Sequence, residues 1–141
     1  MSPGMKQGSS EGSSPVVAQQ ERTFPAEPAA VPAVRHWVTA LAEEATFSEV
    51  VSDLALAVTE AASNVVRHSG SESLTVVWRT EDDRAVVELS DLGVYDEQVA
   101  YPHKVGGLGL PVMTAVMDEV SIQRAPAGRQ GTRVRLIKRK P

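Results

Sequence analysis

The chain has 141 residues, of which 42% are hydrophobic, which is enough apolar material for one globular domain and a tail. Its net charge of −4 and pI of about 5.4 create no overall attraction to nucleic acid or to an anionic membrane. It contains no cysteine, which excludes disulfides, zinc–thiolate sites and thiol catalysis. Without a signal-peptide pattern or a membrane-spanning run, we expect a cytoplasmic protein.

The first 20 residues differ in composition from the rest of the chain. They are rich in Gly, Ser, Pro and Gln, and such a segment buries too little apolar surface to offset its chain entropy. The sequence therefore predicts a disordered tail over residues 1–20 and one domain over residues 21–141.

The domain opens with a short strand and a helix. Residues 21–28, ERTFPAEP, suit an edge strand limited by its prolines. A helix is predicted after Pro32, because apolar residues recur at helical spacing. These residues are Val34, Trp37, Val38 and Leu41.

A second helix is predicted up to Ser69 and Gly70, where glycine can adopt the left-handed cap. Thr46 and Glu49 have the spacing of a capping box at its start. Its apolar positions follow a 3-4-3-4 spacing, which predicts one buried face. They are Val51, Leu54, Val58, Ala61 and Val65.

The second half of the domain changes to a period of two, which predicts a hairpin around a charged turn at residues 81–83. Its alternating residues are Leu74, Val76 and Trp78, then Ala85, Val87 and Leu89. After a loop, a third helix begins near Pro111, and we expect its inward side chains to be Val112, Met113 and Val116. Two final strands are marked by Val120 with Ile122 and by Val134 with Leu136.

This order of elements predicts the fold class. Clustered strands with helices between them indicate an α+β protein, a two-layer sandwich with one mixed or antiparallel sheet under a layer of three helices. The basic residues near the C-terminus are typical of a solvated strand edge. They are Arg133, Arg135, Lys138, Arg139 and Lys140.

The second helix carries a row of polar residues. Glu60, Asn64 and His68 stand four residues apart, and each step drifts about 40° around the helix. The row therefore follows the border of the apolar face, where it can look into a cleft beside the core. The alternative is a solvated flank, with Asn64 and His68 capping the end of the helix.

Asp91 follows the second strand of the hairpin and has the same parity as Leu89. A strand that buries Leu89 sends the Asp91 carboxylate toward the same side, where it needs hydrogen-bond donors. The exocyclic amine of a purine is one candidate donor. The alternative is an aspartate that starts an ordinary turn.

A glycine-rich stretch, VGGLGLP at residues 105–111, precedes the third helix. Glycines let backbone N–H groups approach a ligand closely, and a helix start favours an anion. The stretch is neither a Walker A loop nor a dinucleotide fingerprint. The alternative is a hinge before the helix.

The order and spacing of these pieces resemble the GHKL ATPase superfamily, which has the Bergerat fold, and within it the anti-sigma-factor serine kinases. The strongest pieces are AVTEAASNVVRHSG and GGLGLPVMTAVMDEVSI, and the closing GTRVRLIKRK is similar to the family's last Gly-Thr strand. The resemblance covers about residues 21–140.

The resemblance implies roles for the polar row. Asn64 looks like the residue that coordinates the Mg²⁺ bridging the phosphates of ATP. Glu60 looks like the general base that draws a proton from the attacking hydroxyl.

The resemblance also implies the contacts of the nucleotide. Asp91 looks like the carboxylate that reads adenine, with Gly93 letting the base lie close. Gly107 and Gly109 look like phosphate contacts. Thr132 resembles the hydroxyl that touches adenine through water.

The function implied by the resemblance is that of an ATP-dependent serine/threonine protein kinase that is also an anti-sigma factor. Its expected partners are a sigma factor and a STAS-type anti-sigma-factor antagonist, which it would phosphorylate. Direct nucleic-acid and membrane partners are not expected, and a homodimer is left open. The alternative is a non-catalytic or weakly ATP-binding module on the same fold, because Tyr95 occupies the second glycine position of the family's Asp-x-Gly-x-Gly motif and the loop at residues 94–105 is short for an ATP lid.

Overall fold

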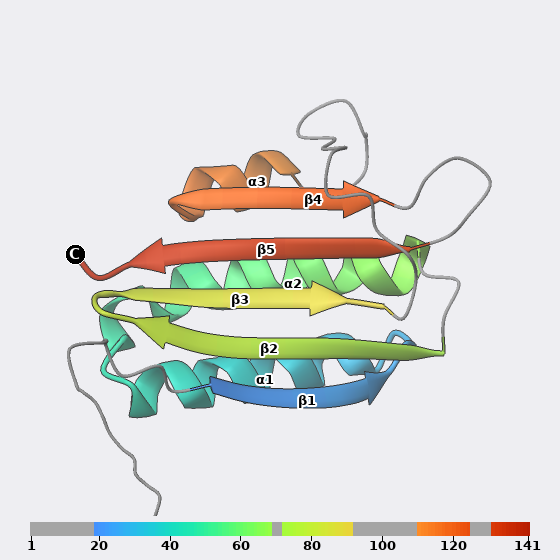
Figure 1. Ribbon diagram of the computed structural model, residues 1–141, viewed down its shortest axis with the longest axis horizontal. Coiled ribbons are helices and arrows are strands. Elements are labelled where there is room, and N and C mark those ends of the chain that lie inside the picture. Colours follow the sequence, from blue (N-terminus) through green and yellow to red (C-terminus); the bar gives the residue numbers. More distant parts are fainter. Residues whose placement is uncertain (1–18, 69–71, 92–109, 125–130) are drawn as a thin grey trace, which may run out of the picture.

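The structure is a computed structural model, and it describes residues 19–68, 72–91, 110–124 and 131–141. Five strands form one sheet in the order β1-β2-β3-β5-β4, and every neighbouring pair is antiparallel. Helices cover one face of this sheet (Figure 1). The predicted α+β two-layer sandwich is confirmed, with an antiparallel rather than a mixed sheet.

The first half of the chain contains β1 (Gln19–Pro25), α1 (Ala30–Glu44), the short 3-10 turn η1 (Ser48–Val50) and α2 (Val51–His68). The second half contains β2 (Ser73–Glu81), β3 (Arg84–Ser90), α3 (Leu110–Val116), β4 (Glu119–Arg124) and β5 (Thr132–Arg139). No helix in these described ranges has the length and apolar character needed to cross a membrane.

One apolar core lies between the sheet and the helices. The helical spacing of α2 is confirmed, because Leu54, Val58, Ala61 and Val65 are fully buried and only Val51, its first residue, is partly exposed. β2, β3 and β5 contribute alternate residues, as the period of two predicts, whereas β1 contributes Phe24. Those of the hairpin are Leu74, Val76, Trp78, Ala85, Val87 and Leu89.

Thr46 ends α1 instead of starting α2, so the predicted capping box with Glu49 is wrong. The φ angle of Thr46 is 64°, and its N–H donates to the carbonyl of Glu43 at 3.3 Å. The N–H of Phe47 donates to the carbonyl of Ala42 at 2.8 Å. This pair of bonds defines a Schellman motif, which satisfies the last carbonyls of a helix. The next turn, η1, has no side-chain cap.

Two other boundaries differ from the sequence prediction. β1 covers residues 19–25 rather than 21–28, and α1 begins at Ala30, before Pro32. Proline is tolerated in the first turn of a helix, because the N–H that it lacks has no partner within the helix there.

α3 buries a narrower face than expected. Met113 is fully buried and Val116 is partly buried, but Val112 is 38% exposed, so the prediction that Val112 faces inward is wrong. Consecutive helical residues point about 100° apart, and a helix of two turns buries only one line of side chains.

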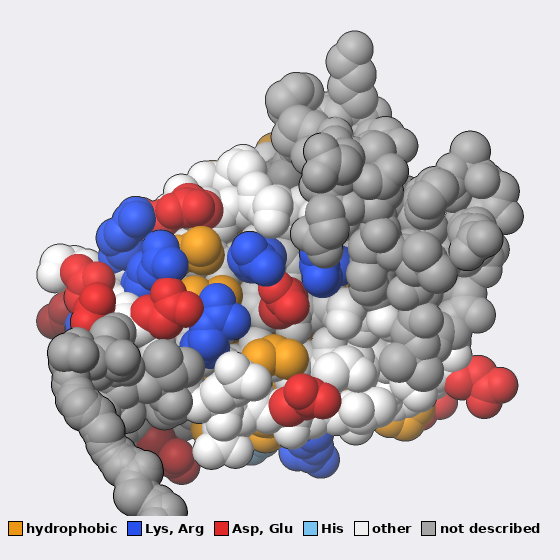
Figure 2. All heavy atoms as spheres, in the orientation of Figure 1, with side chains coloured by type: hydrophobic (Ala, Val, Ile, Leu, Met, Phe, Trp, Pro, Cys, Tyr) orange, Lys and Arg blue, Asp and Glu red, His pale blue; other side chains and the backbone are white. Residues whose placement is uncertain are grey.

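The other face of the sheet carries many charged side chains of both signs, which Figure 2 shows, around the apolar pair Val86 and Ile137. Glu81 pairs with Arg79 at 2.6 Å and with Arg84 at 2.7 Å, and Arg135 pairs with Glu88 at 2.8 Å. β5 lies between β3 and β4, so its basic residues do not form the solvated strand edge that we expected.

Candidate functional site

Asn64 and Glu60 lie on one flank of α2. Asn64 is buried with 2% exposure, and Glu60 is partly buried. Asp53 lies seven residues before Glu60 and eleven residues before Asn64, which is about two and three helical turns. The three side chains therefore point in similar directions from α2. Asp53 contacts Lys138 of β5 at 3.1 Å, and α2 packs between α1 and α3. The burial of Asn64 argues against the solvated flank.

Asp91 and Thr132 meet where β3 ends and β5 begins. Both side chains are buried, with 4% and 1% exposure. The N–H of Thr132 donates to Oδ1 of Asp91 at 3.2 Å, and the N–H of Asp91 donates to the carbonyl of Thr132 at 3.2 Å. The strand parity of Asp91 therefore predicted its burial, and the carboxylate does more than start a turn.

Asn64, Asp91 and Thr132 are the buried polar side chains in the described part of the chain. The C-terminal end of α2, the end of β3 and the start of β5 lie at the same end of the molecule (Figure 1). Within the described residues, the hydroxyl Oγ1 of Thr132 is buried without a hydrogen-bond partner. Burying polar groups is costly unless they are paired, so this end of the fold is suited to a polar ligand.

The donor chemistry fits a nucleotide with a metal ion. The Asp91 carboxylate, held beside the buried Thr132 hydroxyl, can accept a hydrogen bond from the exocyclic amine of a purine. The amide oxygen of Asn64 is a hard ligand of the kind that Mg²⁺ accepts, since Mg²⁺ uses few protein ligands together with phosphate and water oxygens.

Comparison with known proteins identifies the family of the chain. Residues 24–138 match the family described as the histidine kinase-like ATPase domain. The chain belongs to this family. The GHKL resemblance of the sequence is thereby confirmed.

Curated relatives of this histidine kinase-like ATPase domain are serine-protein kinases named RsbW. The protein of Listeria monocytogenes serovar 1/2a is 33% identical over 118 residues, covering 70% of this chain and 75% of that protein. The protein of Bacillus licheniformis is 31% identical over 122 residues, covering 73% and 76%. These relatives confirm the resemblance to the anti-sigma-factor serine kinases.

A solved structure shares the fold. The crystal structure of the RsbU and RsbW domains of Rv1364c from Mycobacterium tuberculosis matches with a TM-score of 0.65 and 22% identity. The match covers 86% of this chain but only 32% of that longer chain.

Several predicted residues of the histidine kinase-like ATPase domain lie outside the described residues. These are Gly93, Tyr95, Gly107 and Gly109, together with the side chain of His68. Their roles stay predictions from the sequence.

The sequence prediction missed that the Lys138 side chain is largely buried. Lys138 has the strand parity of the buried Val134 and Leu136, yet we grouped it with solvated basic residues. That parity was the signal, because it sends the lysine toward the helices.

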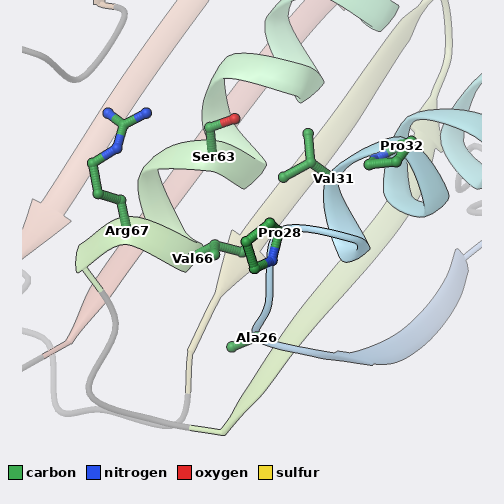
Figure 3. Close-up of a pocket in the computed structure, with 7 residues that line it drawn as sticks. All are labelled: Ala26, Pro28, Val31, Pro32, Ser63, Val66 and Arg67. Carbon is green, nitrogen blue, oxygen red and sulfur yellow. The ribbon is translucent and has the colours of Figure 1, made fainter.

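A separate cavity of about 700 Å³ opens between the start of α1 and the end of α2 (Figure 3). Val31, Pro28 and Val66 line it, and the Arg67 side chain extends away from Pro28 in this view. Ser63 lines this cavity, whereas Asn64, the next residue, points about 100° away around α2. The cavity is mainly apolar and lies outside the cluster of buried polar residues, so we do not assign it to the nucleotide.

Proposed function

We propose that this protein is an ATP-dependent serine/threonine kinase that acts in the cytoplasm on a STAS-type antagonist, and that it also binds a sigma factor and holds it inactive. The observation that carries the proposal is the burial of three polar side chains at one end of the fold: Asn64 on α2, Asp91 just after β3, and Thr132 at the start of β5. The RsbW relatives, which are named serine-protein kinases, support the choice of reaction.

Asp91 and Thr132 bind the purine in this proposal. The N–H of Thr132 holds one carboxylate oxygen of Asp91, so the orientation of the carboxylate is set before a ligand arrives. The adenine amine donates to the carboxylate, and the Thr132 hydroxyl offers a further polar contact. Gly93 would allow close approach of the base.

Asn64 and Glu60 serve the phosphates. Asn64 would hold Mg²⁺, which neutralises phosphate charge when it is bound. Glu60 lies one turn before Asn64 on the same flank, where its carboxylate can accept the proton of the attacking serine hydroxyl. Backbone N–H groups at Gly107 and Gly109 would contact the phosphates.

Two substitutions test these roles separately. Asn64→Ala removes the proposed metal ligand but keeps a good helix former, so we expect a folded protein whose ATP affinity no longer depends on Mg²⁺. Glu60→Gln keeps the shape of the side chain, so we expect ATP binding to survive while phosphotransfer falls about 10²- to 10⁴-fold. Calorimetry with Mg·ATP and transfer of labelled phosphate to candidate antagonists measure the two effects. Normal Mg·ATP binding by Asn64→Ala would contradict the assignment.

A non-catalytic binding module on the same fold is the second candidate. It is favoured by Tyr95, because a residue with a Cβ resists the positive φ that a glycine allows. If the tyrosine opposes ATP, Tyr95→Gly will tighten Mg·ATP binding and leave partner binding unaltered. Absence of ATP binding at millimolar concentration in both proteins would select the binding module.

A further inference from the structure

Lys138 connects three elements through one ammonium group. Its side chain is only 17% exposed although it lies near the end of β5. Its Nζ donates to the carbonyl of Val116, the last residue of α3, at 2.6 Å. The same Nζ lies 3.1 Å from Oδ2 of Asp53, in the first turn of α2.

Each of these contacts is favourable for a physical reason. The last carbonyls of a helix have no partner within it and carry partial negative charge, so a cation at Val116 suits the end of α3. A carboxylate such as Asp53 suits the first turn of α2, where the helix dipole is positive. Lys138 therefore bridges the C-terminal end of one helix and the N-terminal turn of another.

Two backbone contacts fasten the same end of α3. The N–H of Asp118 donates to the carbonyl of Ile137 at 2.9 Å, and the N–H of Arg139 donates to Oδ2 of Asp118 at 2.6 Å. Together with Lys138, three consecutive residues of β5 hold the segment that leaves α3. The C-terminal end of α3 is thus fixed to the sheet, and Lys138 also ties it to α2.

We infer that Lys138 is a positioning residue for nucleotide binding, acting with Asp53 to set the separation of α2 and α3. Asp53 lies on the flank of α2 that carries Glu60 and Asn64, about three turns before Asn64, so this contact helps to fix the N-terminal end of that flank relative to the C-terminal end of α3. The inference rests on the proposed function, because Lys138 acts on the nucleotide only through the flank of α2 that carries Asn64.

The test compares two lysines of the same strand end in the full chain. Lys138→Met keeps most of the apolar stem and removes the ammonium. Lys140→Met is the matched control, because Lys140 contacts Thr46 Oγ1 at 2.9 Å and the Phe47 ring at 4.8 Å, away from α3. Mg·ATP affinity, KM, kcat and hydrogen exchange of the α3 amides are measured for both.

We expect Lys138→Met to weaken Mg·ATP binding about tenfold and to raise KM for ATP while kcat stays within about twofold, since misplacement affects binding geometry and not the proton acceptor. Amides of α3 should exchange faster in this variant without nucleotide. Lys140→Met should leave all four readouts unchanged. Asp53→Asn removes the negative charge beside Lys138 but keeps an oxygen that can accept its N–H, so it should shift KM in the same direction by a smaller factor. This variant carries the test if Lys138→Met does not fold.

Equal Mg·ATP affinity in wild type and in a folded Lys138→Met or Asp53→Asn protein overturns the inference and leaves the proposed function standing. A fall in kcat at constant KM also overturns it, because that places Lys138 in the chemical step. If the wild-type protein itself binds no Mg·ATP, the proposed function fails first, and the positioning role fails with it.

Discussion

Asp91 and Thr132 hold each other across β3 and β5, because each donates its backbone N–H to an oxygen of the other at 3.2 Å. One oxygen comes from the Asp91 side chain and the other from the Thr132 backbone. The carboxylate is therefore part of the sheet's hydrogen bonding as well as the proposed purine contact, and the two roles can be separated by substitution.

Asp91→Asn should separate them. The amide oxygen can still accept the N–H of Thr132, so we expect a nearly unchanged melting temperature. The amide NH₂ cannot accept a hydrogen bond from the purine amine, so Mg·ATP affinity should fall at least about tenfold. Calorimetry measures this loss. Asp91→Ala is the contrast, since it leaves the N–H of Thr132 without this acceptor and should cost about 1–3 kcal/mol of stability. Wild-type affinity in Asp91→Asn would exclude the carboxylate as the purine acceptor.

Thr46→Gly should stabilise the protein. Thr46 adopts a φ of 64°, which is unfavourable for a β-branched residue and natural for glycine at the end of a helix. Glycine also raises the conformational entropy of the unfolded chain, which offsets part of the relieved strain. We therefore expect a net gain of about 0.5–1 kcal/mol in the free energy of unfolding. Urea unfolding measures it. Thr46→Val keeps the branched Cβ and should bring no gain, and a loss of stability in the glycine variant would contradict the strain.

α3 offers a paired test of its buried face. Met113→Ala should cost about 2–5 kcal/mol, because the side chain is fully buried and leaves a cavity. Val112→Ala should change the free energy of unfolding by less than about 0.5 kcal/mol, because Val112 is 38% exposed. Denaturant unfolding of both variants compares them directly, and equal losses would mean that α3 buries both residues.

Glu81 should make stability depend on pH in the acid range. Side-chain hydrogen bonds from Arg84 and then Arg79 outweigh partial burial and lower the pKa of Glu81 below its ordinary value of 4.5. A lowered pKa in the folded state stabilises the protein above the ordinary value, and this stabilisation is lost as pH falls through the folded pKa. The stability difference between wild type and Glu81→Gln should therefore be full at about pH 7 and shrink below pH 4.5. A stability difference that does not change with pH would contradict the lowered pKa of Glu81.

Deleting residues 1–18 should leave the melting temperature nearly unchanged. β1 begins at Gln19, so the deletion keeps every described strand. The deleted sequence has no apolar periodicity that could join the core. Thermal unfolding of the shortened chain measures the effect, and a drop of many degrees would show that the tail packs on the domain.

Local geometry alone determined much of the candidate site. Strand alternation predicted that Asp91 shares the buried side of Leu89, and helical spacing predicted that Glu60 and Asn64 form one row beside the core. These predictions succeed because a strand repeats every two residues and a helix every 3.6, whatever the rest of the chain does. The resemblance of the motifs to a known family added Thr132, and its burial agrees with that choice.

Only the tertiary structure decided the features that depend on distant residues. Pairing of β5 with both β3 and β4 made it an inner strand and put Lys138 between α2 and α3, since no local period encodes strand order. The role of Thr46 was decided in the same way. Its left-handed φ lets Phe47 pack edge-on against Trp78, 6.1 Å away between ring centroids, and that contact joins residues far apart in the chain. A threonine followed three residues later by a glutamate favours the start of a helix, and the burial of Phe47 overrode that local preference and put Thr46 at the end of α1.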